Sequence, residues 1–144
     1  MSLAAAFSLG GCSTFDREWR DARLTPRLQD DLAGRWEGTW RSEVSGHNDQ
    51  LRAVIATGSN GVYSTRFHAR YKKGIFRFSF GYSVPLHVGQ TNDTYQFPGD
   101  ADLGWLAGGS YRYEGSGTGT NFFSTYRCKY DHGTFQMARP AKGD

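Results

Sequence analysis

The sequence YSTRFHARYKKGIFRFSFGY, residues 63–82, decides which fold the chain is predicted to adopt. Aromatic, small or β-branched residues occupy every second position before Lys72-Lys73-Gly74, and aromatic residues do so again after it. Side chains alternate between the two faces of a β-strand, so each half predicts a strand with one aromatic face. A Lys-Lys-Gly segment between two such runs is typical of a hairpin turn. The alternating residues are Tyr63, Thr65, Phe67, Ala69 and Tyr71, then Phe76, Phe78, Phe80 and Tyr82.

The same alternation continues on both sides of this hairpin, from Gly34 onward. Turn signals separate the runs about every 8–12 residues, and Asn60-Gly61 predicts a second tight hairpin. We predict segments 89–93, 97–104 and 115–120 as turns or loops, and a short strand through Leu103 and Trp105. Residues 34–140 therefore predict an all-β domain, a small antiparallel up-and-down β-barrel of about 8–10 strands.

Composition supports this fold class and excludes others. Glycine supplies 19 of the 144 residues and aromatic residues make up 15 %. A disordered chain has few aromatic residues, and a coiled coil is rich in Ala, Glu, Lys and Leu. The many aromatic side chains predict a barrel interior that is mostly filled.

The first residues differ in character from the predicted barrel. Residues 1–11 are apolar or small, and Leu9-Gly10-Gly11-Cys12 resembles the lipobox of bacterial lipoproteins. The resemblance implies a signal peptide over residues 1–11, cleavage before Cys12 and a lipid anchor on Cys12. Ser13 after the cysteine resembles the class sorted to the outer membrane, facing the periplasm. The alternative is the apolar N-terminus of a soluble protein.

Residues 12–33 predict a helical spacer of one or two short helices. Phe15, Trp19 and Ala22 recur at helical spacing, and Thr25-Pro26 predicts the start of a second helix that ends at Gly34. The apolar stripe would either meet the lipid surface or pack on one end of the β domain. Residues 141–144 are expected to form a disordered tail.

Gly34-Arg35-Trp36 at the start of the first predicted strand resembles the Gly-x-Trp of lipocalin and avidin-like barrels, the calycin type. In that superfamily the Trp closes one barrel end and an Arg from the last strands lies over it. The resemblance makes Gly34 and Trp36 structural residues, with Arg127 or Arg139 as the closing arginine. The motifs around Gly46-His47, Phe67-His68-Ala69-Arg70-Tyr71 and Tyr130-Asp131-His132-Gly133 also resemble a group of bacterial lipoproteins that brings no known activity.

A basic row alternates with the aromatic residues of the central hairpin. It contains Arg66, His68, Arg70 and Arg77. If it faces solvent, it forms a polar exterior that would touch anionic lipid headgroups or envelope polymers; if it faces inward, it lines a cavity for an acidic ligand. Together with Trp40, Tyr113 and Tyr126 it makes up the candidate ligand-binding set. Such stretches also suit single-stranded nucleic acid, but an export signal argues against that partner.

The sequence offers little for catalysis or metal binding. His47, His68, His87 and His132 have no metal-ligand spacing, and no Gly-x-Ser-x-Gly elbow occurs. Cys128, Asp131 and His132 are close only in sequence, and Asp100 and Asp102 lack the further oxygens of a calcium loop.

We therefore expect no cofactor, no metal and no catalysis. The expected function is that of a calycin-like envelope lipoprotein that binds a small apolar or acidic ligand. A structural lipoprotein whose solid barrel binds another envelope protein or an anionic polymer is the alternative, and a hydrolase ranks third.

Overall fold

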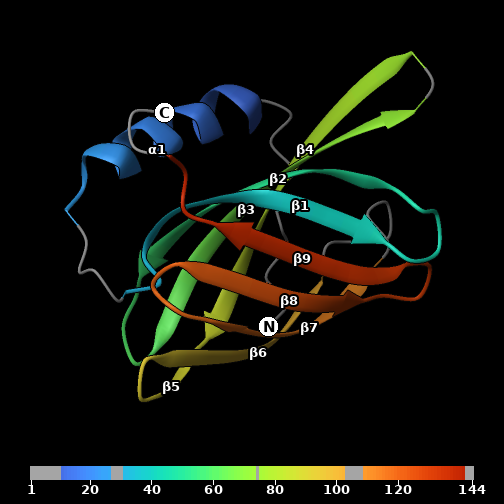
Figure 1. Ribbon diagram of the computed structural model, residues 1–144. Coiled ribbons are helices and arrows are strands. Elements are labelled where there is room, and N and C mark those ends of the chain that lie inside the picture. Colours follow the sequence, from blue (N-terminus) through green and yellow to red (C-terminus); the bar gives the residue numbers. More distant parts are fainter. Residues whose placement is uncertain (1–10, 27–30, 74, 103–108, 142–144) are drawn as a thin grey trace.

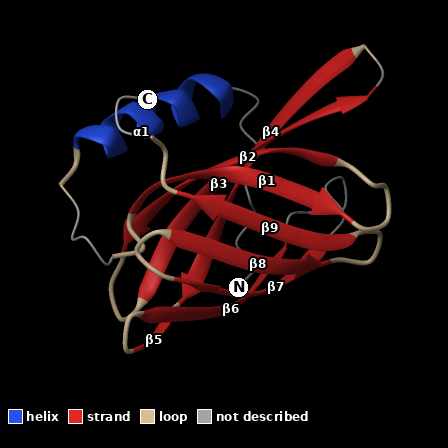
Figure 2. Cartoon of the chain, viewed as in Figure 1, coloured by secondary structure: helices blue, strands red, loops and turns tan. Residues whose placement is uncertain are grey.

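The computed structural model describes residues 11–26, 31–73, 75–102 and 109–141 (Figures 1 and 2). These residues form one helix followed by nine strands. They are α1 (Gly11–Leu24), β1 (Gly34–Ser42), β2 (Asn48–Thr57), β3 (Val62–Lys73), β4 (Phe76–His87), β5 (Gly89–Thr91), β6 (Thr94–Asp102), β7 (Ser110–Gly117), β8 (Asn121–Arg127) and β9 (His132–Ala138).

All nine strands belong to one antiparallel sheet with the order β4-β3-β2-β1-β9-β8-β7-β6-β5. Each strand pairs with its neighbour in sequence apart from β4 with β5, and β1 also pairs with β9. β4 and β6 lie against each other without being hydrogen-bonded neighbours, so the sheet curls into a nearly closed barrel. The predicted all-β barrel is confirmed, including its preceding helix.

Two positions explain why glycine is needed to build this barrel. Asn60 and Gly61 have φ angles of 56° and 73°, the left-handed pair at the centre of a tight turn between β2 and β3, in which the Val62 N–H donates to the Ser59 carbonyl oxygen at 3.1 Å. On β1, a Cβ atom at Gly38 would overlap with the carbonyl oxygen of Gln136 on β9. The first and last strands, β1 and β9, pair so closely at this point that no side chain fits at position 38.

The interior follows the predicted alternation and is filled largely by aromatic rings. On β8, for example, Phe122, Ser124 and Tyr126 are buried, whereas the residues between them are exposed. The prediction of a mostly filled aromatic interior is confirmed for the described residues. Its largest buried apolar side chains are Trp36, Phe67, Phe97, Phe122, Leu51, Ile55, Leu86 and Val84.

Helix α1 packs on the outer wall of the barrel, over β1, β2 and β4 (Figure 1). Phe15 is only 1 % exposed, although it lies outside the barrel. This corrects the expectation that the helical stripe packs on one end of the domain. The predicted second helix is not found in residues 31–33, and residues 27–30 lie outside the described part.

Several predicted loops are strands. β6 continues to Asp102 and β7 continues to Gly117, because both segments pair along the ladder that joins these two strands. Glycine-rich composition was therefore a misleading loop signal at Gly115 and Gly117, where side chains of Phe97 and Leu32 occupy the space beside the backbone. The predicted strand at Leu103 and Trp105 and the tail residues 142–144 lie outside the described residues.

Candidate functional site

One end of the barrel is sealed around Trp36. The indole Nε1 of this buried residue donates a hydrogen bond to the carbonyl oxygen of Leu32 at 2.8 Å. The guanidinium of Arg139 lies 3.8 Å from the centroid of the Trp36 ring. Arg139 also donates hydrogen bonds to the backbone oxygens of Gly119, Arg35 and Asp31, at 2.9, 3.0 and 2.6 Å. Because its donors join three separate segments, Arg139 locks this end of the barrel shut.

The structure thus shows which of the two candidate arginines lies over Trp36. Arg127 is exposed near the other end of the barrel, where it pairs with His132 and Arg112 in the ladders of β8. The assignment of Arg127 as the closing residue is therefore wrong, and Arg139, just after β9, takes that place. Gly34 begins β1 with a φ of 110°, a conformation that favours glycine.

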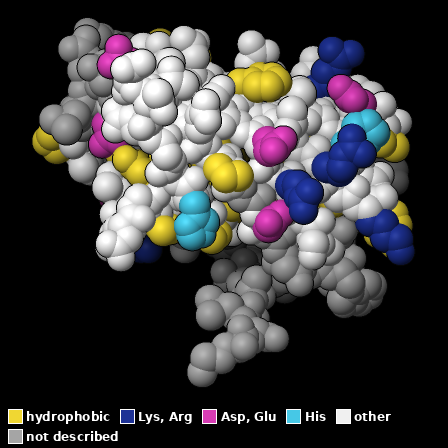
Figure 3. Space-filling view, turned by 90° about the horizontal axis from the view of Figure 1, so that it is seen from below, with side chains coloured by type: hydrophobic (Ala, Val, Ile, Leu, Met, Phe, Trp, Pro, Cys, Tyr) yellow, Lys and Arg dark blue, Asp and Glu magenta, His cyan; other side chains and the backbone are white. Residues whose placement is uncertain are grey.

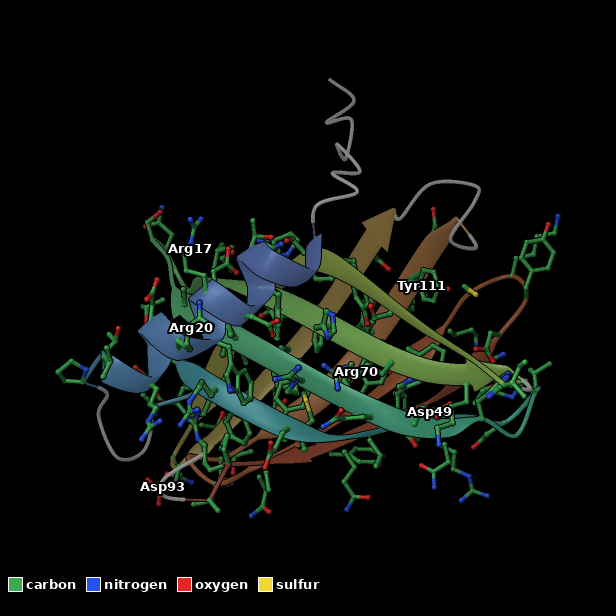
Figure 4. All side chains as sticks on the ribbon, turned by 90° about the horizontal axis from the view of Figure 1, so that it is seen from above. Arg17, Arg20, Asp49, Arg70, Asp93 and Tyr111 are labelled. Atoms are coloured by element: carbon green, nitrogen blue, oxygen red, sulfur yellow. The ribbon has the colours of Figure 1, made fainter. Side chains whose placement is uncertain are left out.

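The opposite end of the barrel carries a group of aromatic and hydroxyl side chains, which we call the tyrosine mouth. Figure 4 shows Tyr111 and Asp49 toward this end, and Asp93, in the turn between β5 and β6, at the sealed end. Trp40 and Tyr111 are half-buried and pack against the core. The mouth comprises Trp40, Ser42, Tyr82, Tyr111, Tyr113, Tyr126, Cys128 and Asp131.

Hydrogen bonds hold the rim of the mouth together around Asp131. Its carboxylate accepts hydrogen bonds from the hydroxyls of Ser42 at 2.5 Å and Tyr126 at 3.0 Å. The indole Nε1 of Trp40 donates to the carbonyl oxygen of Arg70 at 3.3 Å, which ties β1 to β3. These bonds fix side chains from β1, β8 and the β8–β9 turn relative to one another.

Stacked rings form the floor beneath the rim. The ring of Phe135 lies 4.9 Å from that of Tyr126 and 6.0 Å from that of Tyr113, centroid to centroid. On the other side, Phe67 lies 5.6 Å from Phe135 and 5.2 Å from Tyr82. These rings form a solid aromatic layer beneath the rim.

Burial sets the protonation state of the mouth. It raises the pKa of Tyr82, Tyr111, Tyr113 and Tyr126 above the ordinary value for tyrosine, and the hydrogen bond from Tyr126 to Asp131 raises the pKa of Tyr126 further. All four hydroxyls are consequently neutral donors and acceptors at any physiological pH.

The basic row on β3 lies on the outer wall beneath α1. Arg66 donates hydrogen bonds to Glu18 at 2.7 Å and to Thr14 at 3.0 Å. The ring of His68 is buried and stacks on Phe15 with 4.8 Å between centroids. Neither of the two predicted environments, open solvent or a barrel cavity, is therefore correct for Arg66 and His68.

The environment of His68 disfavours its charged form. Burial lowers its pKa, and so do the nearby charges of Arg52, Arg70 and Arg66, while Asp16 opposes them. Arg52 also lies over the Phe15 ring, 5.6 Å from its centroid. Neutral His68 thus packs as an aromatic ring inside a cluster of arginines.

Two further residues of the predicted ligand-binding set are Arg70 and Arg77, which follow Arg66 and His68 along the basic row. Arg70 is exposed on β3, and its backbone oxygen rather than its guanidinium contacts Trp40. The side chain of Arg77 lies outside the described residues. Of the seven predicted binding residues, Trp40, Tyr113 and Tyr126 are the ones the fold brings together at the mouth.

Sequence reasoning missed other members of the mouth. Tyr111 lies two positions before Tyr113 and Tyr82 follows the Phe76–Phe80 series, so alternation alone would have placed both on the inner face. Ser42 and Asp131 carried no such signal, because their contact joins residues 89 positions apart.

The described residues also bear on metal binding and nucleophilic chemistry. No group of three or more His, Cys, Asp or Glu side chains in the described ranges is placed to hold a metal ion. Cys128 is not in a disulfide, and its thiol lies beside the Tyr111 hydroxyl. Asp131 binds Ser42 and Tyr126, while His132 pairs with Glu43 at 3.2 Å, so the neighbours Cys128, Asp131 and His132 do not form a triad.

Cys12 lies in the first turn of α1, and its side chain lies outside the described residues. Within the described ranges, no helix has the length and apolar character needed to cross a membrane.

Comparisons with known proteins found no relative. No protein-family model matches the chain, and neither a curated protein nor a solved structure matches it.

Proposed function

We propose that this protein is a non-catalytic lipoprotein of the cell envelope whose calycin-like barrel binds a small apolar ligand at the tyrosine mouth. The observation that carries the proposal is the difference between the two barrel ends. Trp36 and Arg139 plug one end, whereas the other presents half-buried Trp40 and Tyr111 above stacked rings. Ligand sites are commonly apolar with a few placed polar groups, and the mouth has this composition.

The calycin-like assignment is supported by the two ends of the chain. A Trp near the start of the first strand and an Arg after the last strand meet at the sealed end, as the lipocalin-like resemblance implied. The up-and-down antiparallel order is that of such barrels as well.

The chemistry of the mouth favours an uncharged ligand over an acidic one. Arg66 and His68, which suggested an acidic ligand, lie on the outer wall under α1. The mouth itself offers neutral hydroxyls and one carboxylate, that of Asp131, which would repel an anion. A planar apolar molecule with one hydrogen-bonding group fits these side chains best.

A fluorescent probe tests this proposal. We expect N-phenyl-1-naphthylamine, a neutral aromatic amine that fluoresces in apolar surroundings, to bind the full-length chain saturably. Tyr111→Ala removes one wall of the mouth and should weaken binding about tenfold, whereas Phe123→Ala, on the outer face of β8, should leave it unchanged. Binding that is absent, or equally strong in Tyr111→Ala, contradicts the small-ligand proposal.

The filled interior favours a second candidate, a structural lipoprotein whose outer surface binds another envelope protein. The β3–β4 hairpin extends beyond the barrel wall and carries Ile75, which is 92 % exposed, at its tip (Figure 1). This role predicts that one envelope protein copurifies stoichiometrically with the wild type and is lost with Ile75→Asp. Unchanged copurification, or none with the wild type, argues against it.

The lipid anchor is tested separately. Metabolic labelling with a radioactive fatty acid should mark the wild type, and Cys12→Ala should abolish the label. Retention of label in Cys12→Ala contradicts lipidation at this residue, whatever the barrel binds.

A further inference from the structure

A row of uncharged residues, five polar and one aromatic, crosses the outer wall of the barrel at right angles to the strands. Its members face one another directly in the registers of six consecutive strands, and each is exposed. We call it the amide belt. It consists, from β6 to β2, of Gln96, Ser116, Phe123, Gln136, Thr39 and Gln50.

The belt lies on the outside because the residues beside it in each strand point into the core. Phe97, Phe122, Met137 and Leu51, each one position from a belt residue, are buried. Neighbouring strands lie about 4.8 Å apart, so the four central belt residues, Ser116 to Thr39, span about 14 Å. The belt is thus a straight strip of three amides, two hydroxyls and one aromatic ring.

The centre of the belt lies along a hollow in the barrel wall. This open hollow has a volume of about 380 Å³ and is lined by the four central belt residues together with Asn121, Thr94 and Thr118. Phe123 is 46 % exposed beside it, although a phenyl ring gains by burial. Glu37 is the single charged residue among those that line it.

An ordinary solvent-facing wall would carry more charge. Charged residues make up 22 % of the chain, and exposed strand positions are where they are normally found. Here they flank the belt: Glu114 and Arg41 lie two positions along the strands from Ser116 and Thr39. Seen from below, Lys and Arg side chains lie mostly toward one end of the molecule, whereas Asp, Glu and His side chains are spread across the view (Figure 3).

We infer that the hollow over the amide belt binds an uncharged oligosaccharide. The C–H face of a pyranose ring carries slight positive charge and stacks on the negative face of an aromatic ring such as Phe123. Amide side chains donate and accept at once, so Gln136 and Asn121 match adjacent sugar hydroxyls. The span of about 14 Å across four strands is the length of roughly two to three sugar units. This site is separate from the tyrosine mouth and goes beyond the proposed function.

Other partners fit the hollow less well. Nucleic acids and acidic polysaccharides need cations, and Glu37 would repel them. A stable protein interface buries about 800 Å² on each partner, usually around several aromatic anchors, whereas this hollow presents one exposed ring.

Calorimetric titration of the full-length chain with two neutral probes, cellohexaose and chitohexaose, tests the inference. The first offers hydroxyls only and the second adds acetamido groups, so comparing them tells which sugar chemistry the belt prefers. We expect at least one to bind with little dependence on salt, since no ion pair forms. Polygalacturonate, which is anionic, should bind at least tenfold more weakly.

Matched variants locate the binding. Phe123→Ala should weaken it at least tenfold and Gln136→Ala about fivefold, each with an unchanged circular dichroism spectrum. Tyr130→Ala removes another exposed aromatic ring, 66 % exposed and outside the hollow, and should have no effect. Failure of both probes to bind, or binding indifferent to Phe123→Ala, overturns the inference. Tyr111→Ala, which damages the mouth, should leave sugar binding intact, so the two proposals can fail independently.

Discussion

Arg139 is predicted to contribute more to stability than any other exposed or half-buried arginine whose contacts are described. Its guanidinium makes three hydrogen bonds to backbone oxygens and stacks on Trp36 at 3.8 Å. A hydrogen bond to a charged group contributes about 1.5–3 kcal/mol, and a cation–π contact about 0.5–2 kcal/mol. These contributions are not additive, because water replaces part of the lost bonding at this end of the barrel. We expect Arg139→Ala to lower the free energy of unfolding by about 3–5 kcal/mol.

Two variants separate the possible causes. Arg139→Lys keeps the charge but loses the planar fork that reaches three carbonyls, so about half of the loss should remain. Arg127→Ala removes an exposed arginine from the neighbouring strand and should cost less than about 0.5 kcal/mol.

Urea unfolding followed by far-ultraviolet circular dichroism measures these differences, since this signal reports mainly on the backbone. Near-ultraviolet circular dichroism should also change in Arg139→Ala, because the Trp36 ring loses its neighbour. If Arg139→Ala and Arg127→Ala unfold within about 1 kcal/mol of each other, the sealed-end reasoning is wrong.

Three further predictions follow from the packing. Phe15→Ala should cost about 3–4 kcal/mol and loosen α1, so that trypsin cleaves faster at its arginines, which are exposed but held in a helix. Timed digestion would reveal this, and unchanged digestion would mean that the helix does not depend on this ring. Gly38→Ala should cost about 3 kcal/mol or prevent folding, whereas Gly81→Ala, whose Cβ would lie 3.4 Å from the nearest atom, should cost under about 1 kcal/mol in the same urea assay. Because the folded-state pKa of His68 is lowered, the unfolded chain binds the proton more readily; stability is therefore full above about pH 6.5 and falls as the pH drops below it. In His68→Gln, the urea concentration at the unfolding midpoint should therefore depend less on pH below about pH 6.5. An unchanged slope would mean that other titratable groups cause the pH dependence.

The fold was predictable because its determinants are local. Alternation identified the strands around residues 63–82, and Asn60-Gly61 identified a hairpin whose φ angles require that pair. Trp36 was identifiable from its motif, but its partner was not, since Arg127 and Arg139 both stand at or just after the end of one of the last two strands. The choice between them depends on where β9 ends relative to the barrel rim, which the pairing of β1 with β9 decides.

The environment of the basic row could not be predicted for a related reason. Alternation correctly separates Arg66 and His68 from the inner face, yet it cannot tell whether another element covers the outer face. That depends on how α1 docks, through contacts between residues about 50 positions apart in the sequence, such as Arg66 with Thr14 and Glu18. Phe15 was recognised as part of an apolar stripe, but the partner of that stripe is a histidine, which hydropathy does not identify as an aromatic surface.

The docking of α1 affects how far a lipid anchor on Cys12 would lie from the barrel. If lipidation occurs at Cys12, the anchored residue lies in the first turn of a helix that packs on the barrel, so no free linker separates lipid from domain. The 14 residues of α1 span about 21 Å as a helix but up to about 48 Å when extended. If release of Phe15 from His68 also unwound the helix, this segment would more than double in length. Because protonation of His68 adds charge to a site already bordered by Arg52 and Arg66, acidification acts in the direction of release.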